Sequence, residues 1–125
     1  MKPKLIIILF FLAQHLCSQT TDTTIYLVVD KDPVFPGDSL FKFLIHQLNF
    51  PTSNKCAPPT GRIYVEFVIE TNGKVDFAKI IKRVHPDYDR EVLRVINRMP
   101  DWTPGYKDNK AVRTKRIIPI WIHLR

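Results

Sequence analysis

Residues 61–84 read GRIYVEFVIETNGKVDFAKIIKRV, and this stretch decides the fold. From Ile63 to Ile69, apolar residues alternate with a second set that is mostly polar. Such alternation is typical of a strand with one buried face. The pair Asn72-Gly73 then favours a two-residue hairpin turn, because both central residues of that turn need a positive φ. The stretch therefore predicts two antiparallel strands, residues 62–70 and 75–84.

The alternation in the second of these strands is imperfect. Val75, Ala78 and Ile80 have the character of buried residues, but simple alternation does not place all three on one face. A bulge near Asp76 and Phe77 adds one residue to the strand and brings the three onto the same side. We therefore predict a bulge at that point.

A helix is expected after the second strand. His85-Pro86-Asp87 breaks the strand and offers an N-cap, and acidic residues fill the first turn, where the helix dipole favours them. Pro100 ends the helix. Trp102 follows in a turn, and we expect it to close the end of the sheet. The residues at helical spacing that form the buried stripe are Val92, Val95, Ile96 and Met99.

A shorter helix is expected before the sheet. Two prolines between Pro33 and Asp38 disfavour helix there, and Gly37 or Asp38 caps the helix that follows. This helix ends by Asn49. The apolar residues at helical spacing on its buried face are Leu40, Phe41, Leu44, Ile45 and Leu48, and Phe43 lies off this stripe.

The last strand, residues 111–124, is longer than its neighbours. It has fourteen residues against nine in residues 62–70, so it overhangs that strand. Pro119 lies inside it, and a proline cannot donate a hydrogen bond to a ladder. We therefore expect this strand at an edge of the sheet, with one side open.

Residues 1–18 have the layout of a cleaved secretory signal. Lys2 and Lys4 precede an apolar run, Leu5 to Ala13. This run is much shorter than the ~20 residues that a membrane-spanning helix needs. We therefore expect export to the periplasm. A retained anchor, or a lipid on Cys17, is the alternative.

The remainder of the chain is expected to form a short tether or arm, residues 19–32, and one domain, residues 33–125. The apolar, β-branched run from Ile25 to Val29 is consistent with a short strand or packed arm. Loss of the signal lowers the formal net charge from +7 to +5, because the signal holds two lysines and no acid. The basic residues are spread along the chain without interleaved aromatic residues, so nucleic-acid binding is not expected. Cys56 is then the one cysteine left, which excludes an internal disulfide.

Three segments together resemble the TonB C-terminal domain family. They are the run Met99-Pro100-Asp101-Trp102-Thr103-Pro104-Gly105, the strand end Ile118-Pro119-Ile120, and the opening Pro33-Val34-Phe35-Pro36-Gly37, which is similar to stand-alone versions in Bacteroidetes. The resemblance covers about residues 33–125. It implies an α+β fold with two helices on one face of a three-stranded antiparallel sheet, in agreement with the faces predicted above.

The resemblance also implies how such a domain acts. It holds an extended segment of an outer-membrane TonB-dependent transporter, which adds as a strand to an exposed sheet edge. Gln47 is an implied contact, because Gln47-Leu48-Asn49-Phe50-Pro51 is similar to the family's Gln-Pro-x-Tyr-Pro segment. The expected contacts on the last strand are Arg113, Lys115, Ile117 and Trp121, with His123 at its end. The alternative is that the cations guard the edge and Trp121 packs on the sheet.

A full TonB also has a membrane anchor and a long Pro-rich spacer. Residues 19–32, fully stretched, reach roughly 50 Å. We therefore do not expect this chain to couple directly to an inner-membrane motor, although the family is one of energy transducers.

Catalysis, a metal site and a cofactor are not expected. His46, His85 and His123 fall on separate elements without metal-ligand spacing. Glu66 and Glu70 share one strand face at ~13 Å, too far apart for a catalytic carboxylate pair. Two alternatives to transporter binding are open: self-association as a strand-paired or swapped dimer, and binding to the cell-wall surface.

Overall fold

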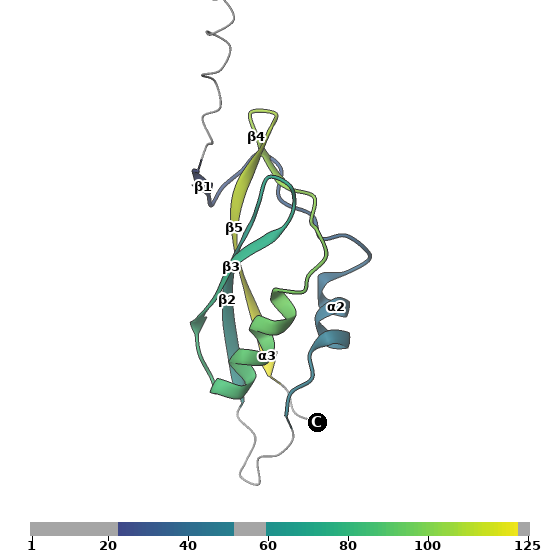
Figure 1. Cartoon of the computed structure of the whole chain (residues 1–125), viewed down its shortest axis with the longest axis vertical. Coiled ribbons are helices and arrows are strands. Elements are labelled where there is room, and N and C mark those ends of the chain that lie inside the picture. The colour runs from purple at the N-terminus through teal and green to yellow at the C-terminus, as the bar shows by residue number, and fades with distance from the viewer. Residues whose placement is uncertain (1–22, 52–59, 123–125) are drawn as a thin grey trace, which may run out of the picture.

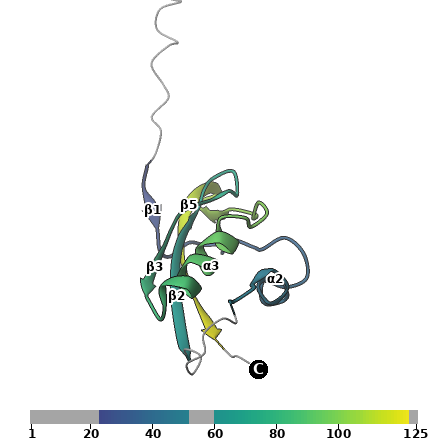
Figure 2. The same ribbon diagram turned by 60° about the horizontal axis from the view of Figure 1, so that its bottom comes forward.

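The computed structural model describes residues 23–51 and 60–122. The predicted signal, Cys56 and His123 lie outside these residues. Figures 1 and 2 show one sheet with both helices on the same side of it. The elements in chain order are β1 (Ile25–Tyr26), α2 (Leu40–Gln47), β2 (Gly61–Ile69), β3 (Val75–Lys82), α3 (Pro86–Ile96), β4 (Gly105–Lys107) and β5 (Lys110–Ile122).

The sheet is mixed and, within the described residues, has five strands. The strand order is β1-β5-β2-β3, and β4 pairs with β5 off this path. The three long strands are antiparallel, as expected. The prediction of a three-stranded antiparallel sheet is nevertheless wrong, because β1 pairs in parallel with β5 and β4 adds a hairpin. The physical reason is the overhang of β5 past β2, which leaves backbone groups that need partners.

The bulge in β3 is confirmed. Glu66 pairs with Lys79 while Val68 pairs with Asp76, so one residue of β2 opposes two of β3. Phe77, in the bulge, has a φ of 51°. The shift places Val75, Ala78 and Ile80 against the core, as predicted. A second shift in register lies between Tyr64 and Val65.

The predicted two-residue turn at Asn72-Gly73 is wrong. The Gly73 N–H donates to the Glu70 carbonyl at 2.9 Å, which closes a four-residue turn, and of the pair only Gly73 has a positive φ, 87°. The two-residue hairpin turn occurs elsewhere, between β4 and β5. There Asp108 and Asn109 have φ values of 50° and 62°, as such a turn requires.

The two helices differ in how well the sequence predicted them. In α3, His85 is the N-cap and accepts from the Asp87 N–H, and the predicted stripe is buried. In α2, Ser39 is the N-cap, not Gly37 or Asp38. The predicted buried face of α2 is also wrong in part. Leu44 is buried and Phe43 packs on the core, whereas Phe41 and Ile45 are 70% and 58% exposed.

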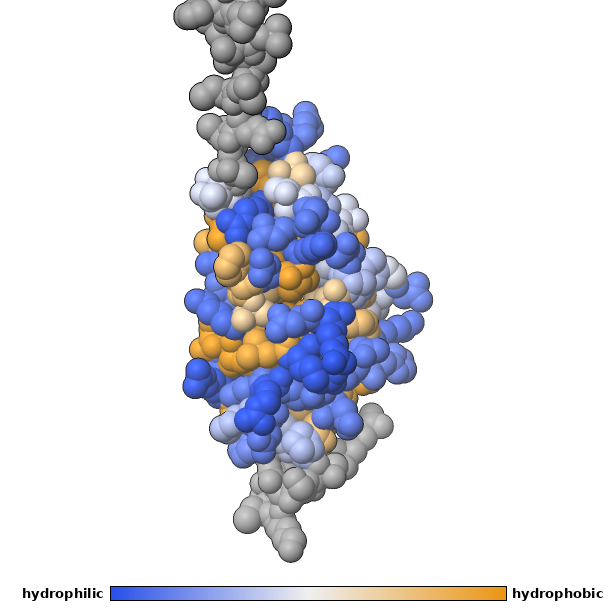
Figure 3. All heavy atoms as spheres, viewed as in Figure 1, coloured by the Kyte–Doolittle hydropathy of each residue, from blue (hydrophilic) through white to orange (hydrophobic). Residues whose placement is uncertain are grey.

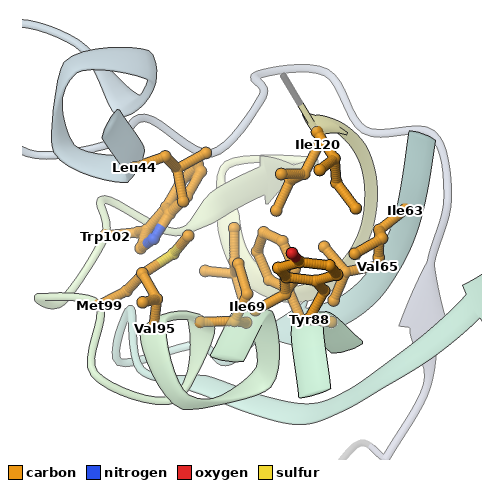
Figure 4. Close-up of a cluster of buried hydrophobic side chains, with 13 residues drawn as sticks. Leu44, Ile63, Val65, Ile69, Tyr88, Val95, Met99, Trp102 and Ile120 are labelled. Carbon is orange, nitrogen blue, oxygen red and sulfur yellow. The ribbon is translucent and has the colours of Figure 1, made fainter. Parts of the chain in front are cut away.

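The core lies between the helices and the inner face of β2 and β5 (Figure 4). Trp102 is buried and lies edge-on to Phe35, with 5.4 Å between ring centroids, and 5.8 Å from the ring of Phe67. The prediction that Trp102 closes the end of the sheet is confirmed. Val34 and Thr103 exchange two backbone hydrogen bonds. These bonds join the Pro33–Gly37 segment to the Met99–Gly105 segment.

Candidate protein-docking edge

The described sheet has two edges that differ in shape. β3 forms one edge, and its two register shifts and its lysines are features that discourage strand addition. β5 forms most of the other edge. It pairs with β2 in uninterrupted register from Thr114–Ile69 to Ile122–Gly61. A guest strand therefore finds a regular partner in β5 and an irregular one in β3.

The orientation of the backbone groups in β5 follows from one hydrogen bond in β2. The Glu70 N–H donates to the Lys74 carbonyl at 2.8 Å, on the β3 side. Backbone groups of successive strand residues point to alternate sides, so Ile69 and the other odd residues of β2 face β5. Their partners in register are the even residues of β5. The N–H and C=O groups of Lys115 and Ile117 therefore point away from β2, as does the carbonyl of Pro119.

This geometry explains the proline in β5. Pro119 lies opposite Tyr64, whose backbone groups face β3. The nitrogen of Pro119 thus points away from β2, where its missing N–H removes nothing from the ladder. The sequence-based expectation that Pro119 marks an open side of the last strand agrees with this position.

The open side does not extend along the whole of β5. Ile25 and Tyr26 of β1 pair in parallel with Arg113 and Thr114. The prediction of a fully open ribbon is therefore wrong for these two positions. From Lys115 to Pro119, no other strand in residues 23–51 or 60–122 pairs with the outer side. We call this stretch the docking edge.

Four of the five predicted contact residues lie on the sheet face opposite the helices. Lys115 forms an ion pair with Glu66 at 2.9 Å, and Glu66 also reaches Lys79 at 3.7 Å. Ile117 is 50% exposed beside the docking edge. Trp121 is 53% exposed, and the Arg62 guanidinium stacks on its ring at 3.9 Å.

The Arg113 guanidinium is the most constrained of these groups. Its Nε and Nη2 donate to the Glu70 carboxylate at 2.8 and 3.1 Å, and its Nη1 donates to the Thr23 carbonyl at 2.8 Å. The Glu70 hydrogen bonds raise the pKa of Arg113. The side chain also lies 5.5 Å from the ring of Phe77. Arg113 therefore ties the N-terminal segment to the sheet.

Gln47 lies apart from these four residues, on the helical side of the sheet. It is the last residue of α2, its side chain is exposed, and its carbonyl accepts from Arg94 Nη2 at 3.1 Å. Glu91 accepts from the Asn49 N–H at 2.9 Å and from Arg94 Nε at 2.8 Å. These hydrogen bonds hold the Gln47–Pro51 segment against α3.

The segment also lines a groove against α3. Its aromatic contact is between Phe50 and Tyr88, edge-on at 4.9 Å, and the Tyr88 hydroxyl donates to the Pro51 carbonyl at 3.2 Å. The groove holds about 750 Å³ and is also lined by Arg90 and Arg94. Figure 3 shows hydrophilic residues gathered over α3 on this face. The sequence analysis did not identify that Glu91 and Arg94, three residues apart on α3, hold this segment.

We expect Glu91→Gln to lower the free energy of unfolding by about 1–3 kcal/mol, because its charged hydrogen bonds to Arg94 and Asn49 are lost. Urea unfolding measures this loss. The control is Asp87→Asn on the same helix, where the ion pair with Arg90 is largely exposed. That change is expected to stay within about 0.5 kcal/mol. Equal losses in the two variants would show that Glu91 anchors nothing.

Two carboxylates make the stability depend on acid pH. The hydrogen bond from Lys115 lowers the pKa of Glu66, and the hydrogen bond from Arg94 lowers the pKa of Glu91, both from an ordinary value of 4.5. A lowered pKa stabilises the fold above the ordinary value, and this contribution is lost as the pH falls through the lowered pKa. Urea midpoints should therefore fall below about pH 4.5. The double variant Glu66→Gln/Glu91→Gln should show a flatter pH profile, and an unchanged profile would contradict the assignment.

Comparison with known protein families agrees with this architecture. The model of the Gram-negative bacterial TonB protein C-terminal family matches residues 46–121. The match spans more than half of the chain and includes α3, the Trp102 turn and the docking edge. The chain belongs to the TonB C-terminal domain family. Neither the curated proteins nor the solved structures yield a match.

Family membership settles the general class of function. TonB C-terminal domains are non-enzymatic protein-interaction domains of the cell envelope, so the expectation that the chain is not an enzyme is confirmed. They interact with TonB-dependent transporters in general. In the described part of this TonB-family chain, no helix has the length and apolar character needed to cross a membrane.

Proposed function

We propose that this chain is an exported TonB-type adaptor that binds an extended segment of an outer-membrane transporter by adding it as a strand to β5. The observation that carries the proposal is the docking edge. From Lys115 to Pro119, backbone groups of a regular strand point away from β2 and meet no other described strand. Backbone hydrogen bonds to such an edge supply the affinity of strand addition.

Side chains beside the edge supply selectivity. Ile117 and Trp121 offer an exposed apolar surface to a guest. Lys115 is paired with Glu66, so its charge is partly balanced and discriminates weakly between acidic and neutral guests. Arg113 contributes by holding the start of the edge. Gln47, at the end of α2 on the helical side of the sheet, contacts the guest only where the guest continues around the domain.

The location proposed for the chain is the periplasm, after cleavage of residues 1–18. The role of the chain is then to hold the transporter segment. The charge of +5 favours a place near anionic envelope surfaces.

Titration with synthetic peptides tests the proposal. The peptides carry the periplasmic N-terminal segments of TonB-dependent transporters from the same genome, and scrambled peptides of equal composition are the control. We expect saturable binding to the transporter peptides alone, by fluorescence anisotropy. If every transporter peptide binds no better than its scrambled form, the proposed function is wrong.

A second candidate function uses the same edge. Two copies of β5 present matching backbone groups and form a strand-paired dimer if they meet edge to edge. Light scattering across a range of concentrations separates this from peptide binding. A monomer at all concentrations excludes the dimer and leaves the adaptor role in place.

A further inference from the structure

The N-terminal segment already occupies the start of the edge assigned to the guest. We propose that residues 23–26 form a displaceable strand that competes with the guest at Arg113 and Thr114. This inference rests on the proposed function, because it concerns the same edge. Ile25 and Tyr26 lie there in parallel register, directly before the open stretch that begins at Lys115.

Contacts with Arg113, Lys107 and the backbone of β5 hold this arm in place. Arg113 Nη1 donates to the Thr23 carbonyl at 2.8 Å. The ammonium of Lys107 lies 5.0 Å from the ring centroid of Tyr26. Ile25 and Tyr26 also pair in register with Arg113 and Thr114 of β5. The arm is thus seated by backbone pairing and one guanidinium, in the same manner in which a short guest strand binds.

The arm buries little apolar surface. Ile25, within the arm, is 39% exposed, and the two residues that follow the arm, Leu27 and Val28, are 70% and 80% exposed. Segments with few buried apolar contacts open at a low free-energy cost. The contacts of β1 are therefore weak enough for a guest strand to replace them.

The base of the arm is fixed independently of β1. The Asp30 and Lys31 N–H groups both donate to the Tyr106 carbonyl, at 2.9 and 3.0 Å, and Asp30 accepts from the Asp108 N–H at 2.9 Å. A released arm therefore stays tethered beside the docking edge. A tethered competitor acts at high effective concentration, so it raises the affinity that a guest needs.

The arm determines how far a guest can pair. A guest limited to Lys115–Pro119 binds beside the seated arm, whereas a guest that also pairs with Arg113 and Thr114 must first displace it. The apparent dissociation constant of the longer guest equals the intrinsic constant divided by the fraction of molecules in which the edge is uncovered. With the arm seated in about nine molecules of ten, its removal tightens binding roughly tenfold.

The test uses the arm itself as the probe. A fluorescent peptide with the sequence of residues 23–30 is titrated into the full chain and into the variant Ile25→Pro/Tyr26→Pro, which cannot pair β1 with β5. We expect the peptide to bind the variant roughly tenfold more tightly. The control Leu27→Ala/Val28→Ala alters exposed residues that follow the arm and lie outside the pairing, and it should bind like the unmodified chain.

A disulfide lock provides the opposite perturbation. Tyr26→Cys/Thr114→Cys joins two residues that are partners in register, within reach of a disulfide across neighbouring strands. Cys17→Ser/Cys56→Ser removes competing thiols. The oxidised protein should bind the arm peptide at least tenfold more weakly than the same protein after reduction, which controls for the substitutions.

The inference is overturned if the peptide binds the proline variant and the unmodified chain equally, or binds neither. Its failure differs from failure of the proposed function, because the arm peptide is not a transporter segment. A transporter peptide long enough to pair with Arg113 and Thr114 as well as with the docking edge is the relevant guest. If it binds the unmodified chain and the proline variant with equal affinity, the docking edge stays in place and competition by the arm is refuted.

Discussion

Gly73→Ala is expected to lower the free energy of unfolding by more than about 3 kcal/mol, the largest stability loss that we predict for a single methyl group. Gly73 has a φ of 87°, a conformation that costs a residue with a Cβ about 1 kcal/mol. A Cβ at this position would also overlap the carbonyl oxygen of Trp102. That contact cannot relax easily, because the Gly73 carbonyl accepts from the Trp102 N–H at 2.8 Å.

Gly37→Ala is the matched control for this experiment. Gly37 has a similar φ of 93°, but nothing lies within 4 Å of the position that its Cβ would take. The free energy of unfolding of this variant should fall by only about 1 kcal/mol, the cost of placing alanine at a positive φ. Urea unfolding of both variants measures the two losses. Their difference gives the cost of the overlap with the Trp102 carbonyl, apart from the cost of the positive φ. Equal losses would mean that the turn at Gly73 does not hold the Trp102 segment in place.

Ile117→Pro is expected to weaken binding of a transporter peptide at least tenfold. The Ile117 N–H faces the docking edge, so proline removes a donor to the guest and places a ring in its path. The loss of one hydrogen bond and the steric conflict together exceed about 1.4 kcal/mol, the equivalent of a factor of ten. Peptide titration by fluorescence anisotropy measures the change.

Two controls define the interpretation of Ile117→Pro. Ile117→Ala keeps the N–H and should weaken binding much less than proline does. Ile118→Pro places proline where the N–H faces β2, so it should unfold the domain instead. If Ile117→Ala and Ile117→Pro weaken binding equally, the side chain and not the backbone holds the guest, and strand addition is excluded.

Much of the fold was predictable because it depends on local patterns. Alternation in β2 and the stripe on α3 each fix a buried face. The bulge was also predictable. Without an extra residue near Asp76 and Phe77, simple alternation does not place Val75, Ala78 and Ile80 on the same buried face. The place of Trp102 followed from a motif that ends a helix and starts a turn.

Other features were not predictable because they depend on register and tertiary contact. β1 has two residues and no periodicity. Its pairing with β5 depends on the overhang of β5 and on the hydrogen bond from Arg113 to the Thr23 carbonyl. The two-residue turn falls at Asp108-Asn109 because β4 and β5 pair there, whereas the Asn72-Gly73 turn must also meet Trp102. In α2 the apolar residues surround most of the helix, so spacing alone did not distinguish Leu44 from Ile45.

The same division applies to the docking edge. The sequence predicted that Lys115, Ile117 and Trp121 share the outer face of the last strand and, through Pro119, that one side of this strand is open. It did not show which backbone groups are available, because this depends on the register between β2 and β5. Nor did it identify Glu91 as the anchor of the Gln47 segment, a contact between residues more than forty positions apart.

The most direct test of strand addition is amide hydrogen exchange along β5 with and without a bound transporter peptide. We expect the Lys115 and Ile117 amides, which face the docking edge, to exchange at least tenfold more slowly in the complex, while exchange of the β3 amides is unchanged. Protection of β3 alone, or a bound peptide that leaves the Lys115 and Ile117 amides as fast as in the free protein, would contradict strand addition to β5.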